Sequence, residues 1–122
     1  MIRTARRKRV VVAIVITVMH DYQCDPLWVS RDGSVREPEA PEDHGLSASL
    51  AGRFEAWRQW GESRVNMADP HDSRAVSDEE DAAFDAEGRL LAARTTAELP
   101  AAVVHYWRDD TRPARAGGGP AA

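Results

Sequence analysis

The segment His-Asp-Tyr-Gln-Cys at residues 20–24 holds the side chains of this sequence that are best suited to covalent chemistry. His20 and Cys24 could form an imidazole–thiolate pair, with Asp21 orienting the ring, as nucleophilic catalysis by cysteine requires. Such a nucleophile also needs hydrogen-bond donors for an oxyanion, but neither a glycine-rich turn nor a helix start directly follows Cys24. We therefore interpret Cys24 as a small apolar side chain at a strand end and predict no catalytic residue. A small enzyme that uses Cys24 with a histidine is the alternative.

The spacing of the other reactive residues does not favour metal or cofactor binding. Cys24 is the only cysteine, and the four histidines are scattered singly along the chain, at His20, His44, His71 and His105. Structural metal sites normally bring their ligands in close pairs, and a disulfide needs a second thiol. We predict no metal, no cofactor and no intrachain disulfide, with the reducing cytoplasm as the default location.

Charged residues are distributed unevenly along the 122 residues of the chain. Five of the 16 basic residues lie within the first nine positions, whereas residues 37–87 hold fourteen acids against four arginines, a balance of −10. An acidic body repels the phosphate backbone, which disfavours nucleic acid as a partner. We infer a non-enzymatic protein-binding module with a basic protein partner, similar to an inhibitor or an immunity protein in its charge alone.

Acidic side chains in the predicted loops are the candidates for contacting such a partner. The helix dipole accounts for acids in the first turn of a helix, but six further acids lie in loops, where this explanation does not apply. The competing interpretation is that loop acids serve only to keep a small domain in solution. The six candidates are Glu37, Glu39, Glu42, Asp43, Asp69 and Asp72.

Residues 1–19 allow two interpretations. A basic start followed by an apolar run at 10–19 imitates a secretory signal or a membrane anchor. However, this run is about half the length of the ~20 apolar residues that a spanning helix needs. Eight of its ten residues are β-branched, which favours a buried strand. We predict a strand preceded by a flexible basic arm at 1–7, which disfavours a membrane partner. A membrane-anchored or secreted protein is the alternative.

Two helical patterns follow in the second half of the chain. Apolar residues recur at steps of three and four over 46–65, with Ser47 as the N-cap. A second pattern over 84–99 follows Ser77, which begins a capping box with acids in the first turn. Pro100 ends this helix. The sequence therefore predicts two amphipathic helices.

Short extended segments lie on either side of the helices. The Asp-Gly dipeptide at 32–33 predicts a tight turn between strands at 27–29 and 34–36. Residues 37–45 contain two prolines and four acids without apolar periodicity, which predicts an exposed loop. The β-branched and aromatic segment 102–107 predicts a closing strand.

These elements predict a single α+β domain over 8–108, followed by a disordered tail at 109–122. We expect a small antiparallel sheet, made of the long first strand, the short hairpin and the C-terminal strand, covered on one face by an antiparallel helix pair. Two long strands alone make a thin sheet, so either the hairpin or a second copy of the chain completes it. The helix register brings Arg53 and Glu87 together across the pair.

The order of these motifs resembles a group of small uncharacterised actinomycete proteins. The likeness spans roughly residues 10–107. It begins with a valine-rich strand followed by Asp-Tyr-x-Cys-x-Pro-Leu-Trp at 21–28, and continues with a Gly-Leu-Ser-capped helix that carries Phe-Glu-Ala-Trp-Arg-Gln-Trp at 54–60. An Asp-Pro loop, a Ser-x-x-Glu-capped helix with Glu-Gly-Arg-x-Leu-Ala-Ala-Arg at 87–94 and a short aromatic strand complete it. The basic arm and the long first strand depart from the usual start of the group. Because the group has no assigned activity, the resemblance implies a soluble domain and no catalytic residue.

Overall fold

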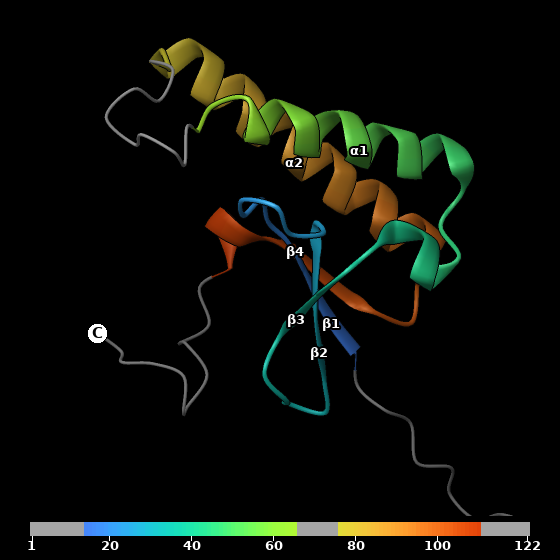
Figure 1. Cartoon of the computed structure of the whole chain (residues 1–122). Helices are drawn as coiled ribbons and strands as arrows, with labels where there is room; N and C mark the ends of the chain where they lie inside the picture. Colours follow the sequence, from blue (N-terminus) through green and yellow to red (C-terminus); the bar gives the residue numbers. More distant parts are fainter. Residues whose placement is uncertain (1–13, 66–75, 111–122) are drawn as a thin grey trace, which may run out of the picture.

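The computed structural model describes residues 14–65 and 76–110 of the chain. The chain forms a four-stranded sheet and two α-helices, and Figure 1 shows the helices packed against one face of the sheet, which confirms the predicted α+β fold. The sheet has the order β3-β2-β1-β4. Its strands are β1 (Ile14–Val18), β2 (Leu27–Arg31), β3 (Glu37–Glu39) and β4 (Val103–Tyr106). The helices are α1 (Ala48–Glu62) and α2 (Asp78–Glu98), with the short 3-10 helices η2 (Pro41–His44) and η4 (Trp107–Asp109).

Several predictions concern segments outside the described residues. These are the arm at 1–7, the first part of the predicted strand, the loop between the helices and most of the predicted tail. Asp109, which we assigned to the start of the tail, lies in η4. Neither of the helices described is long and apolar enough to cross a membrane.

The hairpin turn between β2 and β3 follows the Asp-Gly prediction. Asp32 and Gly33 have φ angles of 52° and 77°, and the amide of Ser34 donates to the carbonyl of Arg31 at 3.0 Å. Positive φ at both central residues is the mark of a type I′ hairpin turn, whose twist matches that of the flanking strands. The turn is therefore encoded locally by the two residues that tolerate this backbone shape best.

The second arm of this hairpin was predicted wrongly. It begins at Glu37 rather than at residue 34, because Ser34 still belongs to the turn. The hydroxyl of Ser34 accepts from the amide of Arg31 at 2.9 Å, and its carbonyl accepts from the hydroxyl of Ser30 at 2.6 Å. Most of residues 37–45, predicted as a loop, instead form β3 and η2. An edge strand tolerates Pro38, which has no amide hydrogen to donate.

The direction of β4 was also predicted wrongly. It pairs with β1 in parallel, with Val15 opposite Val103, so the sheet is mixed rather than antiparallel. The reason lies in the path of the chain between β3 and α1. There η2 brings the chain back to the level at which β1 starts, and His44 of η2 lines the same hollow as Ile14 of β1. The amide and hydroxyl of Ser47 both donate to Glu98 at 2.7 Å, so the helix pair begins and ends at the same place. β4 therefore starts beside the start of β1.

The core lies between the sheet and the buried stripes of both helices. The side chains of Ile16 and Val18 from β1 meet those of Phe54 and Trp57 from α1 and Leu91 from α2. Both N-caps were predicted correctly, because Ser47 and Ser77 accept hydrogen bonds from the third residue of their helices. The hairpin strands complete the sheet, so a thin sheet is no longer a reason to expect a second copy of the chain.

The predicted contact between Arg53 and Glu87 is confirmed. The guanidinium donates to both carboxylate oxygens, with Nη2 lying 2.8 Å from Oε1 and Nε 3.1 Å from Oε2. We expect a double-mutant cycle on Arg53→Ala and Glu87→Ala to give a coupling energy of about 0.5–1 kcal/mol. A bidentate but partly exposed ion pair lies at the upper end of the coupling energies of surface ion pairs. Unfolding in urea, which does not screen charge, measures it. Additive effects of the two substitutions would contradict this prediction.

Candidate functional site

The structure gives one of the two catalytic candidates, His20, a partner other than Cys24. The ring of His20 lies 2.9 Å from the carboxylate of Glu62, at the end of α1, rather than on Cys24. It packs against the aromatic core, and Gly61 provides the space, since a Cβ there would lie 2.5 Å from the ring. The same carboxylate accepts from the amide of Gln23 at 2.8 Å. His20 therefore fastens the corner after β1 to the helix.

The surroundings of Cys24 disfavour a reactive thiolate. Partial burial raises the pKa of the Cys24 thiol, and the negative charges of Asp21 and Asp25 raise it further. A thiol with a raised pKa is a poor nucleophile at neutral pH, because only the thiolate attacks.

We expect Cys24 to react with iodoacetamide at pH 7 more slowly than the cysteine of an unstructured peptide does. The same chain unfolded in urea is the matched control, and its rate should approach that of the peptide. Mass spectrometry measures both rates. Faster modification of the folded chain than of the unfolded chain would contradict the prediction and revive a role for Cys24.

The six loop acids proposed for partner binding have different surroundings. Glu37 and Glu42 are exposed, whereas Asp69 and Asp72 lie outside the described residues. The carboxylate of Asp43 accepts from the amide of Ala40 at 3.2 Å at the start of η2. Glu39 accepts from Arg31 at 2.6 and 2.9 Å and contacts His44 at 2.7 Å. Asp43 and Glu39 thus have structural partners within the chain, which leaves Glu37 and Glu42, among the described acids, as candidates for contact with a partner.

Glu39 should make the stability of the fold depend on pH in the acid range. The hydrogen bonds from Arg31 and then His44 lower the pKa of its carboxyl from 4.5 to about 2, although burial opposes them. A lowered pKa stabilises the fold above about pH 4.5, and this stabilisation is lost as the pH falls toward 2.

Between pH 5 and 2, the free energy of unfolding of the Glu39→Gln variant should therefore fall by about 1 kcal/mol less than that of the parent, because the variant has no carboxyl group to protonate at this position. The difference is no larger because solvent around Arg31 weakens the ion pair. The variant Glu37→Gln, which removes an exposed carboxylate from the same strand, is the matched control. Urea unfolding at a series of pH values measures the difference. Parallel pH profiles for the parent and Glu39→Gln would contradict this prediction.

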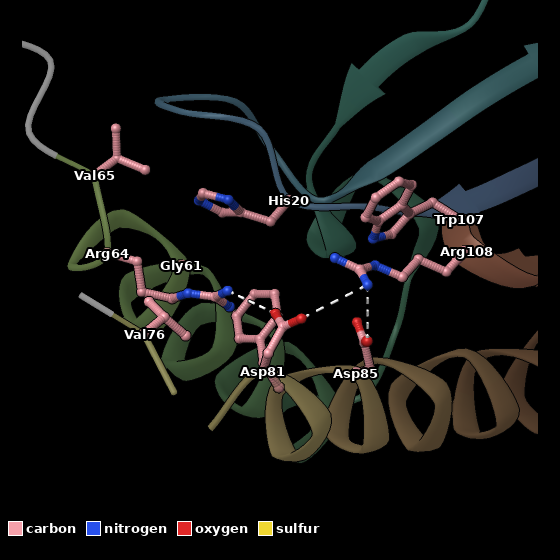
Figure 2. A pocket seen from close by; sticks show the side chains of 10 residues that line it. His20, Gly61, Arg64, Val65, Val76, Asp81, Asp85, Trp107 and Arg108 are labelled. Carbon is pink, nitrogen blue, oxygen red and sulfur yellow. Dashed lines mark hydrogen bonds and ion pairs between the residues drawn. The ribbon is translucent and has the colours of Figure 1, made fainter. Parts of the chain in front are cut away.

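A hollow of about 250 Å³ opens where the end of α1, the first turns of α2, the corner after β1 and η4 come together (Figure 2). We call it the carboxylate hollow, because two aspartates of α2 point into it. Its polar and aromatic walls include His20, Arg64, Asp81, Phe84, Asp85 and Arg108. Four separate segments of the chain therefore contribute side chains to a single small space.

Arg64 and Asp81 form the fixed wall of the carboxylate hollow. Nη2 of Arg64 donates to Oδ1 of Asp81 at 2.8 Å, and the guanidinium lies 4.4 Å from the centre of the Phe84 ring. The Arg64 side chain is only 17% exposed, so both of its contacts are partly shielded from water. Because charge-assisted bonds of this length are strong, this arginine is held in place.

Asp85 forms the floor of the carboxylate hollow. It is buried, and its Oδ1 accepts from the hydroxyl of Tyr106 on β4 at 2.6 Å. Burial, followed by this hydrogen bond, raises the pKa of Tyr106, so the hydroxyl remains a donor. Gly88 of α2 gives the Tyr106 ring its space, because a Cβ at that position would overlap with the ring. The helix and the last strand thus fix the carboxylate between them.

Arg108 lies at the mouth of the carboxylate hollow and is held less firmly. Its Nη1 is 3.4 Å from Oδ2 of Asp85 and 3.7 Å from Oδ2 of Asp81, and 43% of its side chain is exposed. Its guanidinium lies 4.8 Å from the centre of the Trp107 ring, and Trp107 is itself 38% exposed. Strong charged hydrogen bonds are about 2.7–2.9 Å long, so these ion pairs are loose. The second oxygens of the two aspartates are therefore only weakly engaged.

These groups suit recognition of a charged side chain. Two carboxylates, two guanidinium groups and aromatic rings bind charged and planar groups through ion pairs, hydrogen bonds and stacking. In the part of the chain that the structure describes, no group of three His, Cys, Asp or Glu side chains could hold a metal ion.

Sequence reasoning did not find the carboxylate hollow. Asp81 was attributed to the acidic first turn of the helix, and Asp85 was not singled out. One signal was available, because Asp85 stands one helical turn after Asp81 and next to Phe84, on the flank of the buried stripe. A carboxylate beside an apolar stripe needs a buried partner, and that partner is Tyr106 in the closing strand.

Comparison with known proteins adds one finding. The model of a protein family described as Serratia CdiI immunity protein-like matches residues 14–109. The match includes every strand and helix described above, together with the walls of the carboxylate hollow. No curated protein matches the sequence.

Proposed function

The chain belongs to the Serratia CdiI immunity protein-like family, and on this premise we propose that it binds a protein toxin and blocks its action. An immunity protein works by occupying its partner and carries out no reaction of its own. The observation that carries the proposal is the family match over residues 14–109, which takes in the whole described fold. The raised pKa of the Cys24 thiol supports a binding role over cysteine-based catalysis.

We further propose that the toxin presents a basic surface to this chain. Two observations support this proposal. Residues 37–87 carry a formal net charge of −10, and Asp78 and Glu79 are exposed in the first turn of α2. Asp78 stands one helical turn before Asp81, and Asp81 lines the carboxylate hollow. Glu37 and Glu42 are exposed acids of the segment between β2 and α1. Opposite charge on two partners speeds their encounter, and salt weakens this effect.

The test begins with a copy of the chain tagged at its carboxyl terminus and produced in its native host. Proteins that bind it at low salt are recovered, identified by mass spectrometry and expressed alone from an inducible promoter in a test bacterium. We expect one of them to stop growth, and co-expression of this chain to restore it. Recovered partners that leave growth unchanged, or growth arrest that this chain does not relieve, would overturn the proposal.

A further inference from the structure

The size of the carboxylate hollow suits one side chain rather than a whole small molecule. Its volume is about 250 Å³, whereas pockets for complete small ligands usually measure about 300–1,000 Å³. Asp81 at the start of α2 lies on one side of the hollow, and Trp107 and Arg108 of η4, both exposed, lie on another (Figure 2). A pocket of this size beside an exposed aromatic ring is typical of the place where an anchor residue of a binding partner enters.

The chemistry of the hollow favours a guanidinium group as the occupant. Asp81 and Asp85 are one helical turn apart and both direct Oδ2 toward the mouth, where Arg108 meets them. A planar guanidinium bridges two carboxylates and stacks on aromatic rings, whereas an ammonium group does neither as well. The rings of Phe84 and Trp107 already carry guanidinium groups of this chain, from Arg64 and Arg108 respectively.

Arg108 is the weakly bound occupant of this position. Arg64 is held at 2.8 Å from Asp81, while the ion pairs of Arg108 measure 3.4 and 3.7 Å and its side chain is more exposed than that of Arg64. An incoming arginine that reaches 2.7–2.9 Å from the same oxygens would form true charge-assisted hydrogen bonds with them, which are stronger than ion pairs at 3.4 and 3.7 Å. The cost of displacing Arg108 is small because an exposed, long ion pair contributes little.

We propose that the carboxylate hollow is an anchor pocket for one arginine of the partner, and that this arginine replaces Arg108 on Asp81 and Asp85. The inference deepens the proposed function by naming the chemistry of the contact and rests on it only for the identity of the partner. Arg108 then acts as an internal substitute that covers the two carboxylates until the partner binds. Its removal should therefore strengthen binding of a cation rather than weaken it.

The test is an NMR titration of the full ¹⁵N-labelled chain with Nα-acetyl-arginine amide. Nα-acetyl-citrulline amide, which has nearly the same shape without the charge, is the control ligand. We expect the arginine derivative to shift the backbone signals of Asp81 and Asp85 and the indole signal of Trp107. The proposal would be overturned if the citrulline derivative shifted the same signals equally. It would also be overturned if the arginine derivative shifted only signals elsewhere in the chain.

Two variants make the test specific. Arg108→Gln removes the internal substitute, and Arg89→Gln removes a similarly exposed arginine that is paired with Asp109 outside the hollow. We expect Arg108→Gln to bind the arginine derivative about threefold to fivefold more tightly than the parent, and Arg89→Gln to bind it as the parent does. The inference would be wrong if the two variants bound the arginine derivative with equal affinity, or if Arg108→Gln bound it more weakly than the parent.

The titration uses no toxin, so its outcome is independent of the growth experiment. A positive titration with failed rescue of growth would overturn the proposed function and leave the pocket standing. Rescue of growth together with a negative titration would remove the pocket alone. Once a toxin is identified, Arg108→Gln should bind it at least as tightly as the parent, and Asp81→Asn should bind it about tenfold more weakly.

Discussion

Replacing Trp57 with alanine is expected to lower the free energy of unfolding by about 3–5 kcal/mol. The Trp57 side chain is 1% exposed, its ring stacks on Phe84 with 4.6 Å between centroids, and its indole N–H donates to the Phe84 carbonyl at 3.0 Å. Truncation removes a large apolar area from the core and leaves a cavity that the helix pair cannot close. Small domains are stable by only about 5–15 kcal/mol, so this single change should bring the chain close to unfolding.

Urea unfolding followed by circular dichroism measures this loss. The variant Trp57→Phe is the matched control, because it keeps an aromatic ring against Phe84 and removes the indole donor. We expect it to cost clearly less than the alanine variant. A Trp57→Ala variant that is as stable as the parent would show that the stack on Phe84 does not hold the two helices together.

Replacing Gly88 with alanine is expected to destabilise the fold by about 1–3 kcal/mol, the range seen when an extra methyl group is forced into a packed core. In an exposed helix the same change would stabilise by about 1 kcal/mol, because glycine is a poor helix former. At Gly88 the methyl group meets the ring of Tyr106, which is 2% exposed and tied to Asp85 by its hydroxyl. The ring cannot move away without breaking that hydrogen bond, so the steric cost exceeds the gain in helix propensity.

The control for this prediction is Gly52→Ala. Gly52 is an exposed residue of α1, and no atom lies within 4 Å of the position that its Cβ would occupy. The two substitutions are chemically identical, so helix propensity contributes equally to both. We expect thermal unfolding to show a higher Tm for Gly52→Ala and a lower Tm for Gly88→Ala. Two variants that shift in the same direction would mean that Tyr106 does not fill the space above Gly88.

Local patterns predicted the parts of this fold that depend on neighbouring residues. Ser47 and Ser77 cap their helices, and the Asp-Gly turn at 32–33 closes the hairpin, because each signal acts within four residues. Arg53 and Glu87 were also placed correctly, since an antiparallel helix pair of known length fixes which residues lie level.

The errors in prediction come from interactions between distant segments. The direction of β4 depends on how far η2 carries the chain back along the sheet before α1 begins. The sequence of residues 37–45 does not indicate that distance. Glu39 looked like a free loop acid because its partner Arg31 lies across the hairpin. The carboxylate hollow draws on the corner after β1, both helices and η4, so no window of sequence contains its pattern.

The parallel pairing of β1 with β4 limits how early in synthesis the sheet can be completed. Val15 pairs with Val103, which lies far along the sequence, so one side of β1 has no partner until residues 103–106 have left the ribosome. Contacts between such distant segments slow folding, and an unpaired strand edge in the meantime invites aggregation. Tyr106 and Arg108 complete the carboxylate hollow, and they emerge after His20, Arg64, Asp81 and Asp85. A nascent chain that has not yet exposed residues 103–108 therefore offers no finished pocket to a partner.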